Sequence, residues 1–196
     1  MTADPARRRT RLPAPERRRL ILEAAAELFA QRGFDAGSID AIGERVGISG
    51  PAIYRHFPRK QDIVIALLDD AIGRALEEAR AAEHEAADPH ARLVEASRRL
   101  ADLAVRERAV LGLLAGELPG LSKDDRERII ALRDQLLGWW IDALRAWRPY
   151  LEPVRARLLV RGIFALAATL ARVPDPEAGD ALVPTMEAMI LALLAA

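Results

Sequence analysis

The sequence predicts an all-α protein in which a helix-turn-helix domain is followed by a larger helical domain. Apolar residues recur at helical spacing along most of the 196 residues, and no segment shows the strict alternation of a half-buried strand. Prolines and glycines divide this pattern into separate helices. Within residues 38–60, two short segments with capping residues flank a glycine, which is the layout of a helix-turn-helix. We divide the chain into an arm (residues 1–14), a head (residues 15–62) and a body (residues 63–196).

The arm is basic, with Arg7, Arg8, Arg9 and Arg11 between two prolines. It has no helical periodicity, so we expect a flexible segment. Two interpretations stay open at this point. The arm reaches phosphates or a minor groove of DNA, as arms of other helix-turn-helix proteins do, or it is a solvated tail.

The head begins with a predicted amphipathic helix over residues 16–31. Ile21, Ala25, Leu28 and Phe29 fall on one stripe of this helix, and Gly33 ends it. In a three-helix domain, such a first helix packs across the next two and supplies their core.

The residue pattern of the next segment, residues 38–57, predicts two short helices joined by a tight turn. Ser38 can cap the first helix, because its hydroxyl accepts a hydrogen bond from a free N–H of the first turn. Gly47 turns the chain at no steric cost. Ser49 is a second expected cap, and Pro51 fits the first turn of the second helix, which we expect over residues 52–57.

An ordinary helical corner shares this turn pattern, so the side chains of the second helix matter. Tyr54, Arg55 and His56 have polar tips that can reach phosphates or base edges. Short helices of this kind enter the major groove with their N-terminus first.

The sequence of the body predicts six helices, and the first of them begins directly after Lys60. The head and the body therefore share one rigid element, through which motion in the body can swing the head. The expected helices cover residues 61–85, 90–107, 110–118, 122–147, 154–173 and about 184–196.

Charge and composition narrow the classes of function. Residues 1–60 hold 12 Lys/Arg against 7 Asp/Glu, whereas residues 61–196 hold 17 against 22, and a basic end on an acidic chain indicates a polyanionic partner. The chain has no cysteine, hence no disulfide framework and no thiolate metal site. No apolar run reaches the length of a membrane span, and the N-terminus lacks the apolar stretch of a signal peptide. We expect a cytoplasmic, nucleoid-associated protein without a membrane partner.

The sequence contains no catalytic constellation. Its three histidines are His56, in the second short helix, and His84 and His90, which a break at Pro89 separates. A solvated helix end explains His84 better than a metal site does. We therefore expect no enzyme activity, no metal and no cofactor.

Four motifs of the head resemble the DNA-binding domain of the TetR family of transcriptional regulators. They are Gly33-Phe34, residues 38–42 (SIDAI), residues 46–49 (VGIS) and residues 53–60 (IYRHFPRK), within a resemblance that covers about residues 16–64. The resemblance implies double-stranded operator DNA as a partner, touched from Ser38, Gly50, Pro51, Tyr54, His56 and Lys60. Tyr54, His56 and Lys60 would hold phosphates. Ser49 and Arg55 complete the expected DNA-binding set.

Three positions depart from the family pattern. Gly50 stands where a polar, often basic, side chain is frequent, and Ala52 where a hydroxyl often meets a phosphate. Asp40 stands where many members carry a basic residue. An acidic group near DNA lowers affinity unless it accepts from a cytosine amino group. No operator sequence follows from the resemblance.

The last two predicted helices carry small and apolar residues on much of their surface. The small residues that allow close approach of another helix are Gly162, Ala165, Ala167, Ala168, Ala188 and Ala192. A four-helix interface of a homodimer, as in TetR-like proteins, accounts for this surface; the core of a monomer is the alternative.

A small-molecule site is expected among the body helices. The expected lining is Leu103, Arg106, Leu113, Arg133, Leu136, Trp140 and Phe164. Each tryptophan is equally typical of a core, Trp139 and Trp140 point about 100° apart on their helix, and either arginine fits a surface ion pair as well as an anionic ligand.

The region 117–140 is similar to the TetR-like regulators that respond to acyl-CoA thioesters. We expect a repressor released from a palindromic operator by a small lipophilic or acyl-CoA-type effector. The alternatives are a multidrug-type regulator that responds to lipophilic cations, and a helical ligand carrier without specific DNA binding.

Overall fold

The computed structural model describes residues 13–114, 121–172 and 179–196, without the side chains of residues 112–114. Over these ranges the chain is all-α, as predicted. The helices are α1 (Ala14–Ala36), α2 (Ile39–Val46), α3 (Gly50–Tyr54), α4 (Lys60–Glu85), α5 (Pro89–Arg106), α6 (Arg108–Leu114), α7 (Lys123–Trp147), α8 (Pro153–Leu170), the short 3₁₀ helix η1 (Gly179–Ala181) and α9 (Leu182–Ala195). None of these helices is long and apolar enough to span a bilayer.

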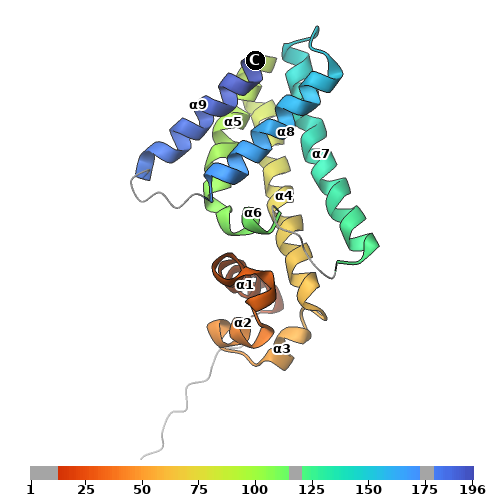
Figure 1. Ribbon diagram of the computed structural model, residues 1–196, viewed down its shortest axis with the longest axis vertical. Helices are drawn as coiled ribbons and strands as arrows, with labels where there is room; N and C mark the ends of the chain where they lie inside the picture. The colour runs from red at the N-terminus through yellow and green to blue at the C-terminus, as the bar shows by residue number, and fades with distance from the viewer. Residues whose placement is uncertain (1–12, 115–120, 173–178) are drawn as a thin grey trace, which may run out of the picture.

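The head lies at one end of the molecule, where α1 packs across α2 and α3 (Figure 1). Its core is apolar and fully buried at Ile21, Phe29, Ile42 and Ile53. The backbone of α1 leaves helical geometry at Gly33 (φ 79°, ψ 164°), where the sequence predicts the end of this helix. The bend turns the chain toward the start of α2.

Helix α4 runs from the head through the body, as the sequence predicts (Figure 1). The hydrophobic cluster of the head takes side chains from α4 as far as Ala71 and includes Val110 of α6. The cluster of the body begins at the next residue of α4, Ile72. The division at residue 62 therefore falls within a helix that contributes to both cores.

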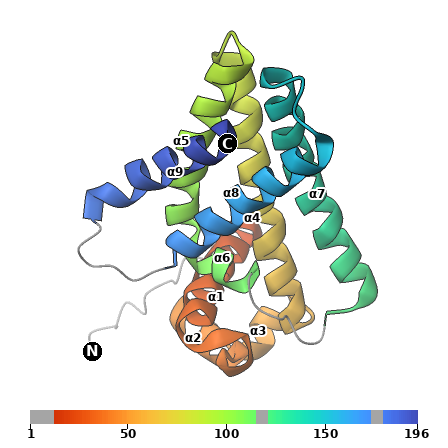
Figure 2. The same cartoon turned by 45° about the horizontal axis from the view of Figure 1, so that its top comes forward.

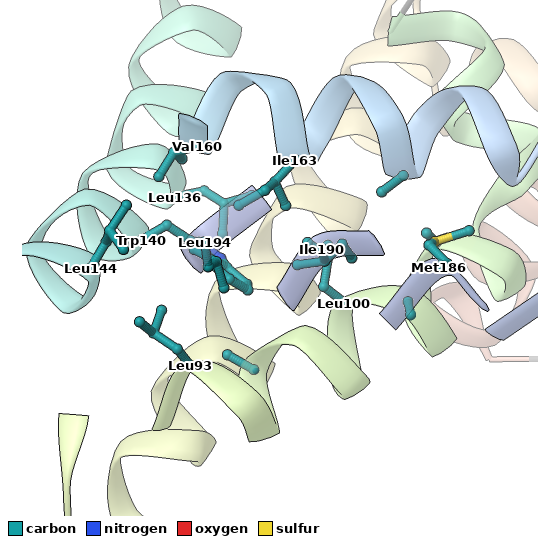
Figure 3. Packing of buried hydrophobic residues seen from close by; sticks show 14 of the residues in the cluster. Leu93, Leu100, Leu136, Trp140, Leu144, Val160, Ile163, Met186, Ile190 and Leu194 are labelled. Carbon is teal, nitrogen blue, oxygen red and sulfur yellow. The ribbon is translucent and has the colours of Figure 1, made fainter. Parts of the chain in front are cut away.

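The body packs α4 between α5 and α7, and α8 crosses them (Figure 2). Side chains from α5, α7, α8 and α9 converge on one apolar core, in which Trp140 is 1% exposed (Figure 3). Trp140 packs edge-to-face against Phe164 and Trp139, at centroid distances of 5.8 and 5.6 Å. The core interpretation therefore holds for Trp140.

Most predicted helix starts are confirmed, and the second short helix is corrected. Ser122 accepts from the Asp125 N–H (3.1 Å) and caps α7, and Asp88 caps α5. The predicted helix 52–57 is wrong in its bounds, because α3 spans Gly50–Tyr54. Tertiary packing explains the difference: Phe57 is buried in the core of the head, so the chain turns before it. The Ser49 side chain makes no capping hydrogen bond; its carbonyl receives the Ala52 N–H instead (2.9 Å).

A network of ion pairs joins α4 and α5. Arg99 donates to Glu78 (2.8 Å) and Glu85 (2.6 Å) of α4 and to Glu95 of its own helix (2.6 Å). The hydrogen bond from Arg98, helped by Arg99, lowers the pKa of Glu95 to about 2, although burial acts in the opposite direction. A carboxylate with a lowered pKa stabilises the fold above its unfolded pKa, and this stabilisation disappears as the pH falls toward 2.

We expect Glu95→Gln to lower the free energy of unfolding at pH 7 by about 1–2 kcal/mol, a value reduced for solvent screening. The difference from wild type should shrink as the pH falls from about 4.5 toward 2, because Glu95 becomes protonated over that window. Urea denaturation at pH 7, 4 and 3 measures both proteins, with the exposed Glu83→Gln as control. An equal difference at pH 7 and pH 3 would show that the charge of Glu95 is irrelevant.

Candidate nucleic-acid interface and ligand cavity

The turn between α2 and α3 has the predicted chemistry. The Ser38 hydroxyl accepts from the Ala41 N–H (3.1 Å) at the start of α2. Gly47 adopts the left-handed conformation (φ 69°, ψ 33°) that favours glycine. Its N–H donates to the Glu44 carbonyl (3.3 Å), and the Ile48 N–H donates to the Gly43 carbonyl (3.0 Å). These bonds fix the angle between the two helices.

Helix α3 is anchored on one side and free on the other. Ile53 and Phe57 are buried beneath it. On the opposite side Pro51 and Arg55 are exposed, and Tyr54 is 50% exposed. The Tyr54 ring thus leaves much apolar surface in contact with solvent. Tyr54 lies at the end of a helix whose position the core of the head fixes. The polar face that the sequence predicts for this helix therefore faces solvent.

The two remaining expected phosphate ligands, His56 and Lys60, have partners inside the head. His56 is half-buried, and its carbonyl lies 3.5 Å from the Arg18 guanidinium. The Lys60 ammonium donates to the carbonyls of Phe34 and Asp35 and lies 4.2 Å from the centre of the Phe34 ring. Burial lowers the pKa of Lys60, and the nearby Asp35 opposes this effect. Lys60 thus closes the C-terminal end of α1.

Arg18 also has a structural partner. Its guanidinium stacks on the Phe57 ring at 4.2 Å and ties the start of α1 to the end of α3. Arginines at a helix N-terminus oppose the helix dipole, and for Arg18 this contact supplies a compensation within the head.

The body contains a half-open cavity of about 990 Å³ between α4, α5, α7 and α8. Its apolar wall includes Leu68, Ile72, Leu100, Leu103, Ile129, Leu136, Leu137 and Phe164. Four residues expected at a ligand site, Leu103, Arg133, Leu136 and Phe164, line this cavity. The volume and apolar wall are those of a site for a drug-sized molecule.

Three expected ligand-site residues are not brought to the cavity. Trp140 lies in the core behind Phe164. Arg106 turns outward, where it pairs with Asp102 (2.8 Å), so its alternative interpretation as a surface ion pair holds. The side chain of Leu113 lies outside the described residues.

The rim of the cavity carries more cationic than anionic groups. Among the described residues, Arg126, Arg133 and Arg161 line it, together with one carboxylate, Glu107, which pairs with Arg74 (2.9 Å). Arg133 pairs with its neighbour Asp134 (3.5 Å), and no ion pair within the described residues involves Arg126 or Arg161. Arg126 and Arg161 were not expected at this site, because an arginine on a helix surface is ordinary and only the packing of α7 against α8 places them together.

The cavity borders the core of the head. Leu68 and Ala71 belong to the cluster of the head and also line the cavity, and Ile129 of α7 packs against that cluster from the other side. An ion pair adds a second connection, because Arg59, just before α4, reaches Asp125 in the first turn of α7 (3.3 Å). Hydrogen bonds from Ser122, together with Arg59, hold the pKa of Asp125 below its usual value.

The residues matched by a known family model coincide with this head. Residues 21–67 match the model described as bacterial regulatory proteins, tetR family. The head is a tetR-family domain. The matched residues include all of α2 and α3, and they extend over the first two turns of α4.

A curated TetR-like relative agrees over the N-terminal part. The HTH-type transcriptional activator FasR of Mycolicibacterium smegmatis is 38% identical over 87 residues, which are 44% of this chain and 40% of FasR. The chain thus spans less than half the length of the curated relatives it matches.

Solved structures extend the similarity to the body as a fold. PfmR from Thermus thermophilus superposes with a TM-score of 0.77 at 24% identity, over 89% of this chain and 97% of PfmR. AibR, solved with isovaleryl coenzyme A and operator DNA, gives a TM-score of 0.75 at 19% identity, over 90% of this chain and 97% of AibR. At these identities, the similarity shows the fold and leaves the ligand of this chain to its own cavity.

Proposed function

We propose that this chain is a homodimeric transcriptional repressor of the TetR family whose two heads bind the half-sites of a palindromic operator on the nucleoid. The observation that carries the proposal is the exposed face of α3, held on a fixed turn by the buried Ile53 and Phe57. A short helix presented in this way can enter the major groove. Operator DNA in the AibR structure supports this role for the fold.

We assign the DNA contacts by position on this surface. Pro51, at the exposed N-terminus of α3, faces base edges, and Tyr54 contacts a base or a phosphate. Gly50, which the resemblance also implies as a DNA contact, is buried and approaches DNA only through its backbone. Ser38, Ser49, Arg55 and His56 contact phosphates. Lys60 reaches a phosphate only if its ammonium leaves the carbonyls of Phe34 and Asp35. In the free protein, Lys60 instead positions the start of α4 against α1.

We assign the dimer interface to α8 and α9. Val154 and Leu158 of α8 are 55% and 62% exposed, and Met189 of α9 is 41% exposed. Large apolar side chains gathered on two adjacent helices favour burial against a second copy. A two-fold pairing through these helices would present two heads to one duplex, which is what a palindromic operator requires.

We propose an amphipathic anion, such as a lipophilic acid or an acyl-CoA, as the effector. The apolar wall would take an acyl chain, and the arginines of the rim would hold a carboxylate or phosphates. The isovaleryl coenzyme A in AibR is consistent with this class of ligand for the fold. Lipophilic cations fit less well, because Glu107, the one carboxylate among the lining residues that the structure describes, already pairs with Arg74.

Release of DNA would follow from the shared elements. A ligand in the cavity touches Leu68 and Ala71, which belong to the core of the head, and residues of α7 beside Asp125. A shift of α7 would pull on the Arg59–Asp125 ion pair and tilt the head. A ligand changes this equilibrium only through its different affinity for the two states, a coupling of about 1–3 kcal/mol in typical cases.

Removing two arginines of the rim tests the effector assignment. We expect Arg133→Gln with Arg161→Gln to raise the acyl-CoA concentration for half-maximal operator release by about tenfold or more, since charged hydrogen bonds contribute about 1.5–3 kcal/mol each. Fluorescence anisotropy of labelled operator measures release by a panel of acyl-CoAs, free fatty acids and lipophilic cations. Arg145→Gln, on the exposed side of α7, is the matched control.

The panel also separates the alternatives. Release by cations alone would replace the acyl-CoA effector with a multidrug-type response. An unchanged acyl-CoA response in the double variant would show that the rim does not bind the anion.

A further inference from the structure

The N-terminus of α3 holds two residues that the sequence marks as unusual, and the structure places them in contact. Gly50 is the first residue of α3 and is buried, although its neighbour Pro51 is exposed. Asp40, in the first turn of α2, is exposed, and its carboxylate lies next to Gly50. A methyl group added to Gly50 would overlap the Asp40 Oδ1 atom and would lie 3.4 Å from the Asp40 Cγ atom, whereas the Ile39 Cγ2 atom would be at 3.8 Å.

A side chain on residue 50 would therefore require the Asp40 carboxylate to turn away from its present position. A side chain on residue 50 would occupy the space that the Asp40 carboxylate fills. Because residue 50 is a glycine, the chemical group presented at the start of α3 comes from α2 and is acidic. The absence of a side chain at Gly50 and the acidic residue at Asp40 are thus one local arrangement rather than two separate departures.

An ionised carboxylate restricts which base it can face. It has only acceptor oxygens. In the major groove, guanine presents N7 and O6 and thymine presents O4, all acceptors, so either would repel the carboxylate. Adenine presents its N6 amino group beside the N7 acceptor, whereas cytosine presents the N4 amino group as a donor. Cytosine is therefore the base that Asp40 accommodates best.

We propose that the Asp40 carboxylate, seated against Gly50, selects a cytosine at one position in each operator half-site. This inference rests on the proposed function, since it requires α3 to lie in the major groove. The alternative role of Asp40 is structural: an acidic residue in the first turn of α2 stabilises the helix dipole. The two roles differ in their effect on sequence preference.

The experiment is a selection of randomised duplexes by the full-length protein, followed by sequencing. Wild type should enrich cytosine at one position of each half-site. Asp40→Asn should move the preference at that position to adenine, because an asparagine amide pairs with the N6 and N7 atoms of adenine, and should bind the wild-type sequence about tenfold more weakly. Asp40→Ala should accept all four bases there and keep the other positions.

Gly50→Ala supplies an independent variant that leaves Asp40 in the sequence. Its methyl group displaces the carboxylate, so it should lose the preference for cytosine as Asp40→Ala does. Glu44→Gln is the matched control, because it removes an exposed negative charge one turn further along α2. It should strengthen binding to all sequences slightly and leave the selected bases unchanged.

The outcomes distinguish this inference from the function on which it rests. If wild type and Asp40→Asn enrich the same base at every position, Asp40 serves only the helix dipole and the inference is wrong. If wild type enriches no sequence at all, the proposed DNA-binding function fails, and the inference fails with it.

Discussion

Replacing Tyr54 with alanine should weaken operator binding by about 100-fold, since a base-pair contact contributes about 1–3 kcal/mol and a dimer loses two such contacts. Tyr54 is half-exposed on α3 and sits beside the buried Ile53, so the core of the head holds its position. The substitution removes no buried side chain. Helix content and thermal stability should therefore stay at the wild-type level.

Gel-shift titration of operator DNA measures the effect, with circular dichroism as the check on folding. Tyr150→Ala is the matched control, because Tyr150 is fully exposed in the body and should leave DNA binding unchanged. Wild-type affinity in Tyr54→Ala would contradict the assignment of α3 as the recognition helix.

The double variant Leu158→Glu, Ala188→Glu should dissociate the dimer and abolish tight operator binding. Both positions are exposed in one copy, on the faces of α8 and α9 that we assign to the interface. A two-fold interface would bury each new carboxylate twice without a partner, at a cost of several kcal/mol. A monomer contacts one half-site only, so its affinity for the whole operator should fall by several orders of magnitude.

Light scattering at micromolar concentration reports the mass of each variant, and anisotropy reports its affinity for the operator. Ala146→Glu, on the exposed side of α7, should remain dimeric. We choose Ala188 rather than Ala168 for the charged substitution, because Ala168 is half-buried and lines the cavity, so a glutamate there would also disturb the ligand site. A monomeric wild type would rule out the interface.

The head was predictable from sequence because its signals are local. Ser38 caps α2 and Gly47 takes the left-handed conformation where the residue types predict them. The end of α3 was not predictable in this way, since it depends on where Phe57 is buried. The contacts of Lys60 within the head were not predicted either, because its partners are carbonyls 25 and 26 residues earlier in the chain.

The cavity was predictable only in part. Helical periodicity identifies which face of a helix is apolar, and this sufficed for Leu103, Leu136 and Phe164. Periodicity does not tell whether an apolar side chain packs against another helix or faces a cavity. The position of Trp140 in the core was therefore not predictable in this way. The charged rim combines residues of α7 and α8, and no local pattern brings them together.

A competition measurement tests whether the head binds DNA in a sequence-specific way. Full-length protein is titrated with the duplex that it selects and with a scrambled duplex of equal length, at about 50 and about 200 mM salt as examples of low and moderate ionic strength. We expect a preference of about 10³-fold or more for the selected duplex, in a complex that salt weakens steeply. Equal affinity for the two duplexes would contradict this expectation.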